Sequence, residues 1–175
     1  MKGVPSERVS DIGRAAETLG SDSSQVRGGQ QIKPTRLVAA FLDAVTEWAR
    51  SQTDVVGVAL VGSQARGVAR DDADIDLVVL MDRPQVYLRN NTWTSKFGEV
   101  VLVHREDWGR IQSLRVWYAD GREVEYGLTT PEWASVPLDR GTLRVASEGL
   151  RVLFDRVGLL AAMLREADSG GCVQS

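Results

Sequence analysis

The chain has 175 residues, 43% hydrophobic and 26% charged, so it is long enough to bury an apolar core without disulfides or metals as staples. Its formal net charge of −3 and its pI near 5.3 do not indicate the excess of positive charge that is typical of proteins that bind nucleic acid, which argues against an enzyme acting on long DNA or RNA. The single cysteine, Cys172, excludes an internal disulfide and a cysteine metal cluster. No run approaches the roughly 18 consecutive apolar residues of a membrane span, and the first residues carry no apolar signal segment. We therefore expect a cytoplasmic protein that does not enter a membrane.

The regular apolar patterns divide the chain into three parts. Residues 1–33 are rich in Gly, Ser, Gln and charge, which is typical of a flexible leader, although residues 7–19 have apolar side chains at helical spacing. Residues 34–167 are predicted to form a single domain. Residues 168–175 are predicted to be a flexible tail.

The domain begins with a helix and a strand. From Thr35 to Trp48, apolar residues recur every three or four positions, which predicts an amphipathic helix. Residues 55–61 form a β-branched run of strand length, buried on both faces. A second strand is expected to end at Met81. This succession favours an α/β (α+β) layer architecture.

The later elements are less regular. Residues 85–97 are ambiguous between helix and loop, and the next strand is expected to end at His104, a lone histidine that we expect at the surface. Asp120-Gly121 lies between two strand-like runs and predicts a hairpin with a type I′ turn. The remaining expected elements are a short helix at 142–147, a strand at 151–155 and a helix from Leu159 to Leu164.

Two carboxylates mark the start of the second strand. Because successive side chains of a strand point to opposite faces, Asp74 and Asp76 share one face, while Ile75, Leu77 and Val79 share the other. Neighbouring carboxylates repel each other unless a cation lies between them. Hard oxygen ligands of this kind suit a divalent cation, usually Mg²⁺ when phosphates supply the other ligands.

A Gly-Ser turn follows the first strand. Gly62 lets the backbone approach a ligand closely, and the following amides can point at an anion. If residues 63–66 open a short helix, its positive end faces the same place. Ser63 adds a hydroxyl donor, and Arg66 adds a guanidinium suited to phosphate. The simplest ligand for this turn together with the carboxylates is a metal-bound nucleoside triphosphate.

Gly62-Ser63, a loop and Asp74-Ile75-Asp76-Leu77 resemble the signature of the nucleotidyltransferase superfamily, typified by DNA polymerase beta. The fuller Gly-Ser-x-Ala-Arg-Gly form is most similar to the minimal and aminoglycoside-type nucleotidyltransferases, and the strong match covers residues 58–80. The resemblance implies a mixed central β-sheet flanked by helices. It also implies transfer of a nucleoside monophosphate (AMP from ATP) to a hydroxyl of a small molecule or protein, with pyrophosphate released and two Mg²⁺ ions assisting.

The resemblance also implies a third carboxylate on a later strand. Glu123 and Glu125 face one way in the second strand of the predicted hairpin, so Glu125 is expected to fill this role and Glu123 is the alternative. Glu125 would either complete the shell of one metal or accept the proton of the acceptor hydroxyl. Either glutamate could instead simply face solvent.

The acceptor and the oligomeric state stay open. Residues after the second strand are expected to extend the same sheet, which leaves little room for a helical acceptor-binding domain. Scattered acids could attract a cationic sugar; they are Glu106, Asp107, Glu123 and Glu132. An alternative reading is a binding protein with this fold, such as the antitoxin that holds a toxin partner. Paired carboxylates favour catalysis, because a pure binding protein has no physical need for them.

Overall fold

The computed structural model describes residues 34–68 and 73–170. The expectations of a flexible leader at 1–33 and of a short helix at 7–19 therefore lie outside the described residues, as does most of the expected tail. Over the described ranges, no helix combines the length and the apolar character needed to cross a membrane.

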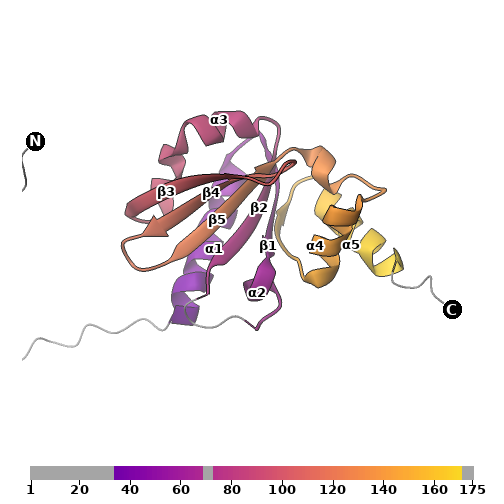
Figure 1. Cartoon of the computed structure of the whole chain (residues 1–175), viewed down its shortest axis with the longest axis horizontal. Helices are drawn as coiled ribbons and strands as arrows, with labels where there is room; N and C mark the ends of the chain where they lie inside the picture. Colours follow the sequence, from indigo (N-terminus) through magenta and orange to yellow (C-terminus); the bar gives the residue numbers. More distant parts are fainter. Residues whose placement is uncertain (1–33, 69–72, 171–175) are drawn as a thin grey trace, which may run out of the picture. The chain divides into compact units, whose positions relative to one another are not determined.

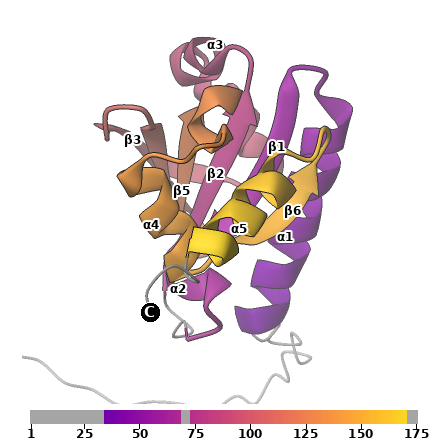
Figure 2. The same ribbon diagram turned by 90° about the vertical axis from the view of Figure 1, so that its right-hand side faces the viewer.

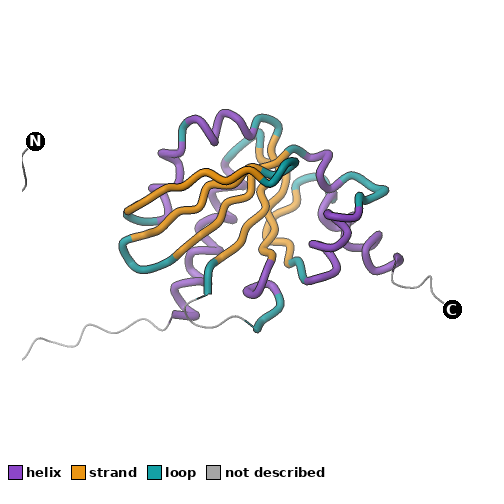
Figure 3. Tube along the Cα trace, in the orientation of Figure 1, coloured by secondary structure: helices purple, strands orange, loops and turns teal. Residues whose placement is uncertain are grey.

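The described residues form one six-stranded sheet with helices packed on it (Figures 1 and 3). The elements in chain order are α1 (Pro34–Ser51), β1 (Val55–Val61), α2 (Gly62–Ala65), β2 (Ile75–Met81), α3 (Pro84–Arg89), η1 (Asn91–Phe97), β3 (Val100–Asp107), β4 (Gln112–Tyr118), β5 (Glu123–Thr129), η2 (Pro131–Ala134), α4 (Arg140–Glu148), β6 (Arg151–Asp155) and α5 (Leu159–Gly170). The strand order is β3-β4-β5-β2-β1-β6. Strands β2 and β5 run parallel and the other neighbours antiparallel, which confirms the predicted mixed sheet and the α/β (α+β) class.

Helix α1 covers one face of the sheet with the apolar stripe that its sequence predicts. Phe41, Val45 and Trp48 are buried in the core on this face, and the Phe41 ring packs edge-on against Tyr126 of β5, with ring centroids 6.3 Å apart. The indole of Trp48 stacks on that of Trp93 in η1, with ring centroids 4.8 Å apart. This aromatic packing explains why residues 85–97 are ambiguous in sequence, since α3 and η1 depend on contacts with distant residues.

Helices α4 and α5 and the short helix η2 cover the opposite face over β1 and β2 (Figure 2). Leu160 of α5 is fully buried there with Met163, against Leu80 of β2. A Cβ added at Gly57 of β1 would lie 3.0 Å from Leu160 Cδ1, so a small residue at this position lets α5 approach the sheet. The alternation of β2 thus supports two cores, one on each face.

Strand β3 is longer than the sequence predicts. It continues past His104 and stays paired with β4 as far as Asp107 and Gln112, where the Trp108 amide donates to the Ile111 carbonyl across a tight turn (2.9 Å). The prediction that this strand ends at His104 is therefore wrong, although the His104 side chain is exposed as expected.

The β4–β5 hairpin also differs from prediction. The Tyr118 amide donates to the Arg122 carbonyl (2.9 Å), so the loop has three residues instead of the two of a type I′ turn. Gly121 adopts φ +89°, and the Asp120 carboxylate accepts from the Arg122 amide (3.1 Å). These local bonds favour the longer loop, which sets the pairing of Arg115 with Glu125.

Near the end of the chain, the end of α4 and the bounds of β6 agree with the sequence, whereas the end of α5 differs. Gly149 ends α4 with φ +126°, as expected, and β6 covers the residues predicted for it. Helix α5 extends to Gly170, beyond Asp168, where the sequence suggested that the tail begins.

Leu160→Ala should lower the free energy of unfolding by about 2–5 kcal/mol, because it opens a cavity between α5 and β1. Urea denaturation measures this loss. Leu102→Ala on β3, where the side chain is 56% exposed, is the matched control and should change stability by no more than about 0.5 kcal/mol. Equal losses in the two variants would contradict the packing described for α5.

Candidate active site

The site begins where the turn after β1 meets the start of β2. Val61 pairs with Asp76 across the β1–β2 ladder, and Gly62 follows with φ +70°. A Cβ added at Gly62 would lie only 2.3 Å from Asp76 Oδ2. The positive φ favours glycine here, and a side chain at this position would also displace the Asp76 carboxylate.

The turn forms the single-turn helix α2, with Arg66 as the residue that ends it. The Gln64 side-chain amide donates to the Ala73 carbonyl (3.4 Å), which holds α2 beside the residue that precedes Asp74. Arg66 is exposed, and its aliphatic part lies against Gly149, where an added Cβ would be 2.7 Å from Arg66 Cγ. The expected phosphate-binding segment thus lies next to the start of β2.

The predicted carboxylates come together on one face of the sheet. Asp76 is the direct neighbour of Glu125 across the parallel β2–β5 ladder, and Asp74 precedes β2 on the same side as Asp76. Glu123 lies two residues before Glu125 on the same face, closer to the hairpin loop. The side-by-side pairing with Asp76 makes Glu125 the better placed of the two glutamates.

Arg115 of β4 lies among these acids and was not anticipated. Its guanidinium donates to Glu125 Oε2 (2.5 Å), Glu123 Oε1 (2.7 Å) and Glu106 Oε1 (3.1 Å). Its Nη1 is also 3.5 Å from Asp74 Oδ2. The hydrogen bond to Glu123 and the nearby negative charges raise the pKa of Arg115 above its ordinary value.

Negative charge still exceeds positive charge at Asp76. Burial, followed by the charges of Asp74 and Glu125, raises the pKa of Asp76 from 3.8 to about 6, although Arg115 acts in the opposite direction. No set of three acidic, histidine or cysteine side chains in the described residues is already arranged around a metal position. Arg115 is paired with Glu123 and Glu125, so its charge neutralises part of this cluster.

A cavity of roughly 260 Å³ opens beside Asp76 and Glu125. We call it the Trp108 pocket. Its other lining residues come from β1, β2, β4, β5, α4 and the β3–β4 turn, and those with apolar side chains are Val61, Leu77, Val78, Trp108, Ile111 and Val145. An apolar cavity at the edge of a carboxylate cluster is a typical position for part of a substrate.

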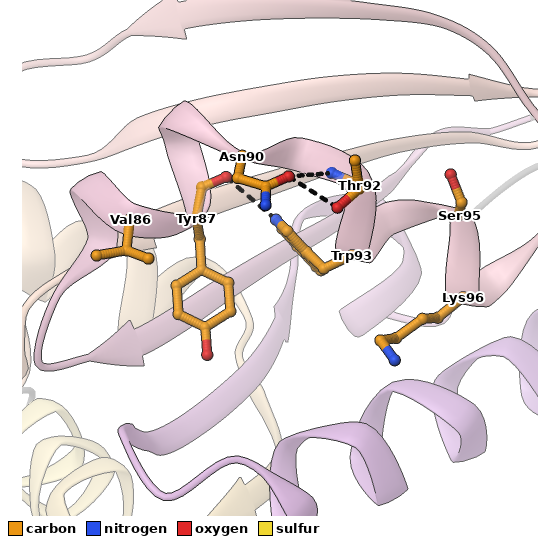
Figure 4. A pocket seen from close by; sticks show the side chains of 7 residues that line it. All are labelled: Val86, Tyr87, Asn90, Thr92, Trp93, Ser95 and Lys96. Atoms are coloured by element: carbon orange, nitrogen blue, oxygen red, sulfur yellow. Dashed lines mark hydrogen bonds between the residues drawn. The ribbon is translucent and has the colours of Figure 1, made fainter.

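A second cavity, of about 500 Å³, lies along α3 and η1 and includes Val86, Tyr87 and Trp93 (Figure 4). Several of its polar groups already have partners. The Trp93 indole donates to the Tyr87 carbonyl (3.2 Å), and the Asn90 side chain accepts from the Thr92 amide (3.2 Å). These hydrogen bonds link the end of α3 to the start of η1, so Asn90 and Trp93 have a structural role there.

Comparisons with known proteins point to one family. Residues 43–128 match the family model described as a nucleotidyltransferase domain. The fold is similar to an aminoglycoside 6-adenyltransferase from Bacillus subtilis, with 15% identity and a TM-score of 0.44 over 54% of this chain and 35% of that chain. It is also similar to the Cid1 poly(U) polymerase, with 18% identity and a TM-score of 0.42 over 64% of this chain and 34% of that chain. No curated protein matches the chain significantly.

The chain spans about a third of the length of these solved structures. The family match covers just under half of the chain, and it includes every residue of the clustered site from Gly62 to Glu125. The structure has the mixed sheet with flanking helices that the superfamily resemblance implies. Residues 43–128 therefore match a nucleotidyltransferase domain, and the described residues have the fold of that superfamily.

Proposed function

We propose that the chain transfers a nucleoside monophosphate to a hydroxyl of a small molecule or protein and releases pyrophosphate, with ATP as the first donor to test. The observation that carries this proposal is the contact between Asp76 and Gly62, which brings a carboxylate site and an anion-binding turn to one point. A triphosphate and a carboxylate repel each other at such close range, so a cation is needed between them.

The residues present fit a divalent cation. Asp74 and Asp76 offer hard oxygen ligands. Burial and, after it, the charges of Asp74 and Glu125 raise the pKa of Asp76, and a bound cation would offset the repulsion among these carboxylates. Mg²⁺, as two ions by the superfamily resemblance, would supply Lewis-acid charge on the phosphate oxygens. Because only Oε2 of Glu125 accepts from Arg115, its Oε1 would serve as a further ligand.

The chain's own groups would bind and orient the donor. Backbone amides from Gly62 onward, the Ser63 hydroxyl and the Arg66 guanidinium would hold the β- and γ-phosphates. The acceptor oxygen then forms a bond to the α-phosphorus while the bond from that phosphorus to the bridging oxygen breaks. Pyrophosphate leaves with the bonding electron pair, and the acceptor proton passes to solvent. The contribution of the protein is mostly positioning and electrostatics.

Asp76→Asn should abolish Mg²⁺-dependent ATP binding and reduce transfer by more than about 100-fold, since even the outer partners of metal ligands contribute up to about that factor. Calorimetric titration of ATP with and without Mg²⁺ measures the binding. Asp82→Asn, at the exposed other end of β2, is the matched control and should bind as the wild type does. Full metal-dependent binding by Asp76→Asn would show that this carboxylate is not a ligand.

Mg²⁺-dependent binding should weaken as the pH falls through about 6, because Asp76 takes up a proton there and the neutral acid is a poor ligand. Titrations between pH 5 and 8 at sub-saturating Mg²⁺, with steps of about half a unit, would show the midpoint. Arg115→Gln removes a charge that lowers the pKa of Asp76, so its midpoint should move to higher pH. A midpoint unchanged by this substitution would place the titrating group elsewhere.

Arg66→Ala should weaken ATP binding by about tenfold and leave adenosine binding unchanged, because a hydrogen bond to a charged group is worth about 1.5 kcal/mol or more. Arg144→Ala, an exposed arginine on α4, is the control and should leave both affinities unchanged. Equal losses for ATP and adenosine in Arg66→Ala would place this guanidinium away from the phosphates.

A further inference from the structure

The Trp108 pocket lies on the face of the sheet that carries the carboxylates, next to Asp76 and Glu125. Its floor is formed by Val78, Ser113 and Gly127, from three adjacent strands. A Cβ added at Gly127 would lie 2.9 Å from Ile111 Cγ2 and 3.2 Å from the Leu77 carbonyl oxygen. The absence of a side chain at Gly127 therefore lets Ile111 lie low over the sheet and close one side of the pocket.

The turn that carries Trp108 and Ile111 is fastened to its surroundings. The Arg110 guanidinium pairs with Asp139 (2.5 Å) and donates to the Glu132 carbonyl (3.0 Å). The Arg110 carbonyl accepts from the Thr129 hydroxyl (2.6 Å). Asp139 also caps α4, the helix whose Val145 forms another wall, so the turn and the helix are held to the same carboxylate.

Among the described residues that line the pocket, one fully buried polar side chain has no hydrogen-bond partner. Ser113 is fully buried, and its hydroxyl makes no hydrogen bond within the described part of the chain. A buried hydroxyl without a partner costs free energy, so such groups are rare unless a water or a ligand completes them. The second cavity, along α3 and η1, has no comparable group among its described lining residues.

The charged side chains that line the pocket lie together, where β2 and β5 pair. Of the described lining residues only Asp76 and Glu125 are charged, and Glu125 is already paired with Arg115. The Trp108 indole is 64% exposed at the rim, where its flat face is available. The interior thus offers apolar walls, one hydroxyl and no further carboxylate for a cationic group.

We infer that the Trp108 pocket binds the acceptor, and that the acceptor carries its hydroxyl on a flat apolar group instead of on a polycationic sugar. This inference rests on the proposed nucleotidyl transfer. With the apolar group in the pocket, the hydroxyl lies at the end where Asp76 and Glu125 are placed. Its oxygen forms the bond to the α-phosphorus, pyrophosphate departs with the electrons of the broken bond, and the proton goes to water.

The test uses benzyl alcohol as the ring-bearing probe and glycerol and glucosamine as probes without a ring. Pyrophosphate release from ATP and Mg²⁺ should be faster with benzyl alcohol than with either of the others by at least about tenfold, since even one buried methylene discriminates by about this factor. Chromatography should recover label from the α-phosphate in the adenylyl ester of benzyl alcohol, separated from ATP and AMP; label found only on the protein would overturn the inference. Equal rates with all three probes would overturn the inference.

Val145→Phe fills the pocket and should remove the advantage of benzyl alcohol while leaving ATP affinity within about twofold of the wild type. Val86→Phe, the same substitution in the other cavity, is the matched control and should keep the advantage. A Val145→Phe variant that retains it would also overturn the inference.

Binding without catalysis separates this inference from the proposed function. Benzyl alcohol should shift the amide resonances of Ser113 and Gly127 in the wild type, and should not shift them in Val145→Phe. If ATP fails to bind but these shifts are seen, the pocket assignment stands and the transfer proposal fails. If ATP binds and these resonances do not move, the pocket assignment fails and the proposed nucleotidyl transfer is unaffected.

Discussion

The site depends on the close approach of Asp76 to the turn at Gly62. The antiparallel β1–β2 ladder places Val61 opposite Asp76, so the chain leaves one strand and enters the next at the same end of the sheet. A Cβ at position 62 would displace the Asp76 carboxylate from its place beside the turn. The backbone of the turn and an anionic side chain are thereby held at one point. Under the proposed function, a phosphate bound by the turn would lie beside this carboxylate, and a cation between the two would relieve their repulsion.

The distribution of helices explains where the charge can accumulate. Helices pack on both faces of β1 and β2, which bury apolar residues on both sides. Strands β4 and β5 bury one face under α1 and η1, and carry Arg115, Glu123 and Glu125 on the other. Arg115 offsets part of the repulsion among the acids and fixes one oxygen of Glu125. Asp76 has no ion pair with Arg115 among the described residues, and its burial and the charges of Asp74 and Glu125 raise its pKa.

Local patterns were sufficient for most of the fold and for part of the site. Short stretches of sequence predict the apolar face of α1, the buried strand β1 and the alternation of acidic and apolar residues around Asp76. The resemblance to nucleotidyltransferases depends on the last of these together with the Gly62-Ser63 turn. Arg115 was missed because its role depends on the hairpin register. A two-residue Asp120-Gly121 loop would pair Ala119 with Arg122 and hence Arg115 with the buried Tyr126, whereas the observed loop pairs Arg115 with Glu125. A change of one residue in the length of the loop would therefore place Arg115 opposite the core face of β5 instead of the face that carries Glu123 and Glu125.

The parallel pairing of β2 with β5 also determines when the site can exist during folding. Asp76 and Glu125 become neighbours only after the chain has passed through α3, η1, β3 and β4 and returned beside β2. Closing so long a connection costs conformational entropy before its contacts are gained, and high contact order slows folding. Neither the β1–β2 pair nor the β3–β4–β5 meander can assemble the carboxylates alone. The pairing of Asp76 with Glu125 is therefore a property of the completed sheet, whereas the β1–β2 pair alone brings Asp76 beside Gly62.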